Sequence, residues 1–170
     1  FTLKDTDGKE HTLAELKGKV VVLEWFNPEC PFIVKHHSEA KKNMTFNKLF
    51  DDYNSKGVVF LAINSSAAGK QGNGLDLNKK MKAECKLPYP ILLDESGDVG
   101  HAYGAKTTPH CFVIKAEGKV AYMGAIDNNK NIDKAGDKNY VKAALDEILA
   151  GKPVTEATTA SYGCGVKYSN

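Results

Sequence analysis

The sequence predicts an α/β fold in which a mixed central sheet is flanked by helices, and its strand and helix patterns both support this. Residues 19–26, "KVVVLEWF", form a nearly continuous run of β-branched and aromatic residues, as expected of a central strand covered on both faces. Residues 57–66 read as a second strand, and the short run 89–94 reads as a minor one. Helical patterns separate these strands, so we expect parallel pairing through crossover helices.

Three helices are expected. The first covers about residues 31–53 and begins at Pro31, a residue well suited to the first turn of a helix. The second covers residues 75–86, where apolar residues recur at roughly helical spacing. The third covers residues 138–152, with its apolar residues on one face and the stop signal "GKP" at its end.

The last part of the chain combines a hairpin with an irregular extension. Residues 110–126 are two strand-like runs around "AEGK", which predicts an antiparallel pair at one edge of the sheet. Residues 154–170 show no periodicity and carry Cys164. With 170 residues the chain suits one domain with a real core. We therefore expect a domain over residues 1–153 followed by a C-terminal extension over residues 154–170.

Charge and hydropathy exclude two kinds of partner. The net charge is only +2, and the 23 basic residues are scattered lysines, which argues against a nucleic-acid surface. No apolar run approaches the roughly 18 to 20 residues that cross a bilayer, so no membrane span is expected. The first residue is Phe1, which fits a chain trimmed of an export signal. We expect an exported, periplasmic or extracytoplasmic protein, with the cytoplasm left open, and the oligomeric state stays open as well.

Cys30 has the position of a reactive cysteine. It lies where the apolar run ends and a helical pattern begins, and unpaired backbone N–H groups at such a junction favour a thiolate. The thiolate is the nucleophilic form of cysteine. Trp25 and Phe32 lie nearby in the sequence and would give a flat apolar surround for a thiol substrate. The alternative is a buried, inert cysteine, which is common for this residue type.

Several motifs carry a resemblance to a known family. "VVLEWFNPECPFI" is similar to the active-site strand and turn of thioredoxin-like proteins. "LKGKVVVLEWF", "YGAKTTPHCFVI" and "GKVAYMGAIDNN" resemble the redoxin or AhpC/TSA group, especially its peroxiredoxin-like thioredoxin-family branch, and "GCGVKY" is similar to a C-terminal cysteine motif of that branch. The resemblance implies a thioredoxin-like fold for residues 1–153, with an N-terminal extension before the first central strand.

The resemblance also implies roles for individual residues. Glu24, six residues before Cys30, matches the buried acid with which thioredoxins move protons to and from their cysteines. A carboxylate inside an apolar strand is costly unless it is partnered, so an outward-facing or salt-bridged Glu24 is the alternative. Pro109 matches the cis-proline loop, in which the backbone of Thr108 would lie beside Cys30 and pair with an extended substrate.

The chain departs from thioredoxins at the second active-site cysteine, because Ile33 stands three residues after Cys30. A reactive Cys30 therefore needs a distant thiol to resolve its mixed disulfide. Cys164 is the leading candidate, since its glycine-flanked segment is free to fold over the site. Cys111 is the second choice, Cys85 reads as a core residue on its helix, and Cys164 as a merely free or structural thiol stays open.

Two other chemistries fit less well. Peroxiredoxins have proline and threonine where this chain has Leu23 and Asn27, and their peroxide-binding arginine has no counterpart because the chain contains no arginine. His36 and His37 would lie about 9 to 10.5 Å along a helix from Cys30, too far to share a metal ion. We expect them to be solvated helix residues and expect no metal site and no cofactor.

The sequence thus favours a thiol–disulfide oxidoreductase. Cys30 would attack a disulfide, Glu24 would assist proton transfer, and Cys164 would resolve the mixed disulfide. The expected partners are a protein or small-molecule disulfide or thiol and an external thiol reductant. A thiol peroxidase is one alternative. A non-catalytic thioredoxin-like binding module is the other, and Ile33 is the residue that supports it.

Overall fold

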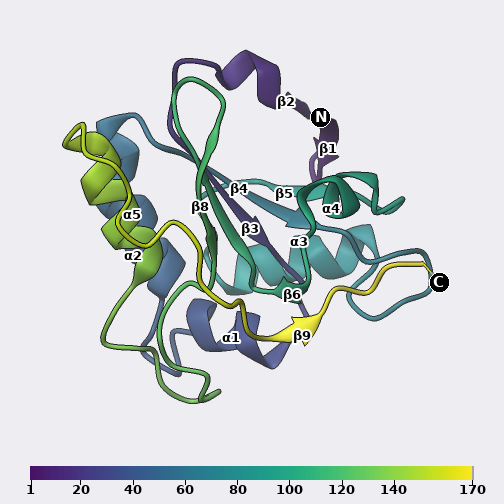
Figure 1. Cartoon of the computed structure of the whole chain (residues 1–170). Coiled ribbons are helices and arrows are strands. Elements are labelled where there is room, and N and C mark those ends of the chain that lie inside the picture. The colour runs from purple at the N-terminus through teal and green to yellow at the C-terminus, as the bar shows by residue number, and fades with distance from the viewer. Residues whose placement is uncertain (170) are drawn as a thin grey trace.

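A computed structural model describes residues 1–169 and contains a seven-stranded mixed sheet, together with a separate two-stranded pair (Figure 1). The order of the large sheet is β2-β1-β5-β4-β3-β7-β8, and β6 pairs with β9. The strands are β1 (Thr2–Asp5), β2 (Glu10–Thr12), β3 (Val21–Trp25), β4 (Val59–Asn64), β5 (Ile91–Leu93), β6 (Thr107–Thr108), β7 (Cys111–Ile114), β8 (Val120–Gly124) and β9 (Cys164–Gly165). The helices are α1 (Pro31–His37), α2 (Thr45–Tyr53), α3 (Leu75–Glu84), α4 (Asp98–Tyr103) and α5 (Tyr140–Leu149), with short 3-10 turns η1 (Leu13–Leu16) and η2 (Asn54–Lys56).

The central strand β3 explains why the sheet is mixed. It runs parallel to β4 and antiparallel to β7, and all its residues are buried, as its apolar sequence predicts. β4 continues the parallel pairing to β5, and β7 forms the predicted hairpin with β8. The predicted fold class is confirmed: a mixed sheet flanked by helices.

Alternate residues of β3 serve two different cores. Val22 faces a cluster built with α1, α2, α3 and α5, whereas Val21 and Leu23 face a smaller cluster built with α4 and the N-terminal residues. Cys30 belongs to the larger cluster. The candidate site is therefore on the face that carries α1.

The single helix predicted over residues 31–53 is wrong, because the chain forms two helices there. Lys42 and Met44 have positive φ angles of 55° and 41°, which an α-helix does not accept. The Asn43 side chain donates to the Lys35 carbonyl, and the Ser38 hydroxyl accepts from the Lys41 backbone N–H. These polar side chains satisfy backbone groups that a continuous helix would have used.

The N-terminal and C-terminal segments add to the sheet and to the site. β1 and β2 extend the sheet beyond β5, so the minor strand predicted over residues 89–94 is an interior strand. The yellow segment in Figure 1 runs from α5 across the molecule to β9, which lies beside β6. Of the predicted extension, only Asn170 lies outside the described residues. No helix within residues 1–169 is long and apolar enough to cross a membrane.

Candidate active site

Cys30 is the N-cap residue of α1, directly before Pro31 in the first turn. Its backbone is extended, with φ −84° and ψ 123°, so the chain turns from β3 into the helix at this residue. The Cys30 Sγ atom donates a hydrogen bond to the Thr108 carbonyl at 3.1 Å, and the side chain is 0% exposed. The sequence suggested a thiolate favoured by free N–H groups, whereas the structure has a buried thiol donating to a carbonyl.

The Thr108 carbonyl is brought to Cys30 by the loop that joins β6 to β7. The Thr108–Pro109 peptide bond is cis. The Trp25 backbone N–H donates to the His110 carbonyl at 2.9 Å, which joins this loop to the end of β3. Residues 26–29 connect β3 to Cys30, so this connection and the β6–β7 loop meet where β3 ends and β7 begins.

Cys164 lies against the same loop. It pairs with Thr108 across the antiparallel β6–β9 ladder, and Gly165 pairs with Thr107. Burial raises the pKa of the Cys164 thiol to about 11, and the neighbouring Cys30 thiol adds to the rise. The structure therefore brings together Cys30, Thr108 and Cys164, which are far apart in the sequence.

The other two thiols are buried in the core. Cys111 is 0% exposed in β7, opposite Glu24 on β3, and burial with the Glu24 charge raises its pKa well above the ordinary value. Cys85 ends α3, and the same two causes raise its pKa to about 11. All four cysteines, these two together with Cys30 and Cys164, are free thiols.

Glu24 is buried and fully partnered. One carboxylate oxygen lies 2.7 Å from His37 Nε2, and the other accepts from the Tyr89 hydroxyl at 2.7 Å. The outward-facing alternative for Glu24 is wrong, since the side chain is 1% exposed, whereas the salt-bridged alternative finds a partner in His37, which lies within ion-pair distance. Burial, followed by the Glu24 charge, raises the pKa of Tyr89. The carboxylate thus lies inside the face that carries α1, with both oxygens occupied.

The two aromatic residues predicted around the thiol occupy different positions. Phe32 packs edge-on against Tyr162, with ring centroids 5.7 Å apart, on the same face as Cys30. Trp25 is fully buried in the core on the other face, where its indole N–H donates to Ser65 at 3.0 Å. Strand alternation is the reason, because neighbouring residues of β3 point to opposite faces. The structure does not bring the Trp25 ring to Cys30.

The histidines of α1 correct a further expectation. His36 and His37 were expected to be solvated, yet both are 0% exposed. The last turn of α1 is buried because other segments pack on it: His37 stacks on Phe46 at 4.9 Å and is hydrogen-bonded to Glu24, and His36 is hydrogen-bonded to Tyr162. Burial lowers the pKa of His36 to about 3. These residues are interior groups of the protein.

The chain matches a known protein family over most of its length. The family model described as Redoxin matches residues 1–145. The chain belongs to the Redoxin family. The resemblance that the sequence motifs suggested is thereby confirmed.

Individual redoxin relatives match over different spans. The Thiol-disulfide oxidoreductase ResA of Geobacillus thermodenitrificans is 32% identical over 122 residues, which are 71% of this chain and 62% of that protein. A crystal structure of an uncharacterized conserved protein from Geobacillus kaustophilus is 31% identical, with TM-score 0.83 over 99% of this chain and 88% of that one. A hypothetical protein from Sinorhizobium meliloti 1021 is 28% identical, with TM-score 0.82 over 99% of this chain and 91% of that one. This redoxin thus spans about 62% of the length of the curated relative.

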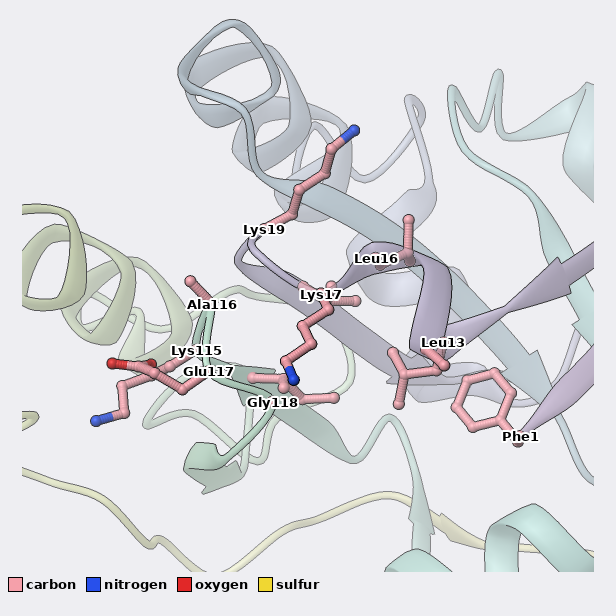
Figure 2. Close-up of a pocket in the computed structure, with 12 residues that line it drawn as sticks. Phe1, Leu13, Leu16, Lys17, Lys19, Lys115, Ala116, Glu117 and Gly118 are labelled. Carbon is pink, nitrogen blue, oxygen red and sulfur yellow. The ribbon is translucent and has the colours of Figure 1, made fainter.

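One hollow of this redoxin lies away from the cysteines. It has a cavity volume of about 390 Å³ and is lined by residues such as Val21 and Ile114, at the opposite end of β3 from Cys30. Figure 2 shows Phe1 beside Leu13 at one end of it and the Lys17 side chain lying across toward Gly118. No cysteine or histidine lines it, so it is not part of the candidate site.

The polar residues that lie beneath the tail were not predicted from the sequence. Tyr162, two residues before Cys164, bonds with Lys35, His36 and Asp127 in the interior of the redoxin. Its place in "SYGCGV" is the one available signal, since a large residue beside a glycine-flanked cysteine suggests an anchor. Within residues 1–169, no group of three or more His, Cys, Asp or Glu side chains is arranged to hold a metal ion.

Proposed function

We propose that this redoxin is a thiol–disulfide oxidoreductase that uses Cys30 as the nucleophile and Cys164 as the resolving thiol. One observation carries the proposal: Cys164 pairs with Thr108, and the Thr108 carbonyl accepts the hydrogen bond from Cys30 Sγ. The ResA relative is named a thiol-disulfide oxidoreductase, which supports the reaction class. Neither Cys85 nor Cys111 lies on the tail, and both are buried.

The reaction has two exchange steps. The Cys30 thiolate attacks one sulfur of a substrate disulfide, the substrate S–S bond breaks, and the leaving thiolate takes up a proton. The Cys164 thiolate then attacks Cys30 Sγ, so that a Cys30–Cys164 disulfide forms and the second substrate thiol leaves. The substrate gains the electrons that the two cysteines lose, and an external thiol reductant returns them.

Access to Cys30 requires β9 to move. Cys30 is 0% exposed, and β9 joins β6 through only two residue pairs. So short a ladder opens at a small cost in free energy, comparable to local fraying. An extended disulfide substrate would then take the place of β9 along Thr108 and Pro109, with Phe32 beside it.

The remaining residues support this chemistry from the interior. Glu24 is proposed to assist proton transfer from the buried network that it forms with His37 and Tyr89. Trp25 is proposed to act through its backbone, which holds the His110 carbonyl at the end of β3. The substrate and the reductant are proposed only as chemical classes, and the exported location stays a prediction from the sequence.

The test is disulfide mapping under controlled oxidation. The reduced protein is treated with a limiting disulfide oxidant, alkylated and digested, and the linked peptides are identified. We expect a link between the peptides of Cys30 and Cys164, with Cys85 and Cys111 alkylated only after unfolding. Four free thiols after oxidation would contradict the proposed pair.

Two variants and one control assign the roles. Cys164→Ser should accumulate a mixed disulfide on Cys30 and lose catalytic insulin reduction, whereas Cys30→Ser should lose the first step as well. Cys85→Ser removes a buried thiol from the core and should keep the reaction. Hydrogen peroxide consumption, measured beside insulin reduction, separates the exchange reaction from a thiol peroxidase. Activity that is insensitive to Cys30→Ser would favour a binding module.

A further inference from the structure

The tail of this redoxin is held by a buried polar cluster, which we call the Tyr162 cluster: Lys35, His36, Asp127 and Tyr162. Lys35 and His36 are 0% exposed, Asp127 is 2% exposed and Tyr162 is 7% exposed. A charged side chain buried to this degree is costly unless it is paired and hydrogen-bonded. The cluster therefore calls for an explanation beyond core packing.

The tyrosine hydroxyl is the centre of the cluster. It donates to Asp127 Oδ1 at 2.5 Å, accepts from Lys35 Nζ at 3.1 Å, and lies 2.9 Å from His36 Nε2. A hydroxyl has one donor and two acceptor positions, and these partners fill all of them when His36 Nε2 carries its proton. His36 Nδ1, 2.9 Å from the Thr45 hydroxyl, then accepts from it. Every hydrogen-bonding position of Tyr162 is thus occupied by a side chain from the domain.

The same two segments carry the cluster and the two cysteines. α1 begins at Cys30 and contributes Lys35 and His36, and the tail carries Tyr162 two residues before Cys164. Anchoring Tyr162 on α1 consequently fixes the distance of Cys164 from the start of that helix. The ring contact between Tyr162 and Phe32 adds to this anchoring from the first turn of α1.

We propose that Tyr162 is a positioning residue that holds Cys164 at Cys30, so that the resolving thiol has a high effective concentration there. The proposal rests on the proposed function, since it concerns the second exchange step. Because Tyr162 is only two residues from Cys164, anchoring Tyr162 limits the volume that the Cys164 thiol can explore. A smaller volume raises the effective concentration of Cys164 at Cys30. β9 can open while Tyr162 stays bound, because the ladder to β6 begins only at Cys164, and loss of the Tyr162 anchor makes this opening more frequent.

The test compares Tyr162→Phe with Tyr168→Phe. Tyr162→Phe keeps the ring against Phe32 and loses the hydrogen bonds to Lys35, His36 and Asp127. Tyr168→Phe is the matched control, because among residues 1–169 the hydroxyl of this second tail tyrosine is hydrogen-bonded only to the Ala105 carbonyl. The effective concentration of the Cys30–Cys164 pair is measured by equilibration with reduced and oxidised glutathione. We expect a fall of about tenfold or more for Tyr162→Phe and less than about twofold for Tyr168→Phe.

A second measurement does not depend on disulfide chemistry between the cysteines. In the Cys164→Ser background, the rate of Cys30 alkylation by iodoacetamide reports how firmly the tail covers it. Tyr162→Phe should raise this rate about tenfold, and Asp127→Asn, which keeps the shape of the side chain, serves as a second variant if Tyr162→Phe unfolds.

Unchanged alkylation and an unchanged glutathione equilibrium would overturn the proposal. A wild-type protein without the Cys30–Cys164 disulfide would instead overturn the proposed function, while the alkylation result still decides whether Tyr162 holds the tail.

Discussion

At the scale of single residues, the two proposed redox thiols differ in how they are held. Cys30 Sγ donates to a carbonyl, and Cys164 is a partly buried thiol whose pKa burial raises to about 11. Only the thiolate attacks a disulfide, so at neutral pH the resolving step uses a small fraction of Cys164. The second exchange step should therefore be the slower one unless Cys164 loses its proton more readily once substrate is attached to Cys30.

This gives a pH dependence for resolution. Cys30 is first converted to a mixed disulfide with thionitrobenzoate. Attack by Cys164 then releases the coloured thionitrobenzoate thiol. The rate of this release is followed by absorbance at 412 nm, without added reductant. Burial is the largest cause that raises the pKa of Cys164, and it remains when Cys30 is loaded, so the thiolate fraction and the rate should still rise with pH from pH 6 to 9. The Cys164→Ser protein should release nothing, and a rate that levels off below pH 8 would contradict the expectation.

Some of the site could be predicted at this scale. Cys30 and Glu24 are candidates because their residue types are unusual for their places, a cysteine between a strand and a helix and an acid inside an apolar strand. The inward positions of His36 and His37 could not be read from the sequence, because the partners that make their burial tolerable come from Asp127, Tyr162 and Glu24. Periodicity reports which residues share a helix face, and it does not report what a distant segment places against that face.

At the scale of elements, local patterns predicted β3, β4, β5 and the β7–β8 hairpin, but not β1, β2, β6, α4 or the ends of α1 and α2. Residues 31–53 have a helical pattern throughout. The helix ends at His37 because polar side chains such as Asn43 form hydrogen bonds with backbone groups there. β9 was missed for a related reason: two residues of glycine-rich tail have no strand pattern, and they become a strand only because β6 offers its free edge. Short elements of this kind depend on tertiary contacts.

The β6–β9 pair requires a glycine at position 163. Gly163 has φ +136°, and a Cβ there would lie 2.1 Å from the Thr108 carbonyl oxygen. Gly163→Ala should therefore push the tail off β6 and lower the effective concentration of the Cys30–Cys164 pair by about tenfold, the scale expected for 1 to 3 kcal/mol of backbone strain. Equilibration with reduced and oxidised glutathione measures this effective concentration.

Gly165→Ala is the matched control for this variant. No atom of the described part of the chain lies within 4 Å of a Cβ built at Gly165, which is in β9, two residues after Gly163. The control should keep an effective concentration close to that of the unmodified protein. Equal losses in the two variants would mean that general disturbance of β9, and not the approach to the Thr108 carbonyl, lowers the value.

At the scale of the whole molecule, the domain keeps two histidines neutral in its interior. Burial lowers the pKa of His36 from 6.5 to about 3, and burial lowers the pKa of His110 from 6.5 to about 4. The unfolded chain protonates these side chains below about pH 6.5, while the folded protein does not until the pH is far lower. Acid therefore stabilises the unfolded state relative to the folded one across this interval.

The free energy of unfolding should consequently fall as the pH drops from 6.5 toward 4 and stay level just above 7. A single buried histidine contributes a slope of up to about 1.4 kcal/mol per pH unit within this window. Urea unfolding at pH 4.5, 5.5, 6.5 and 7.5 measures the slope. His110→Asn keeps an acceptor for the Lys106 backbone N–H and should reduce the slope by removing one of the two groups.

The carboxylates Asp5 and Asp146 have pKa values lowered below 3.8, so they titrate outside the window. A stability that is constant from pH 7.5 to 4.5 would mean that the two histidines take up protons in the folded protein, and the Tyr162 cluster would then have to open or reorganise in mild acid.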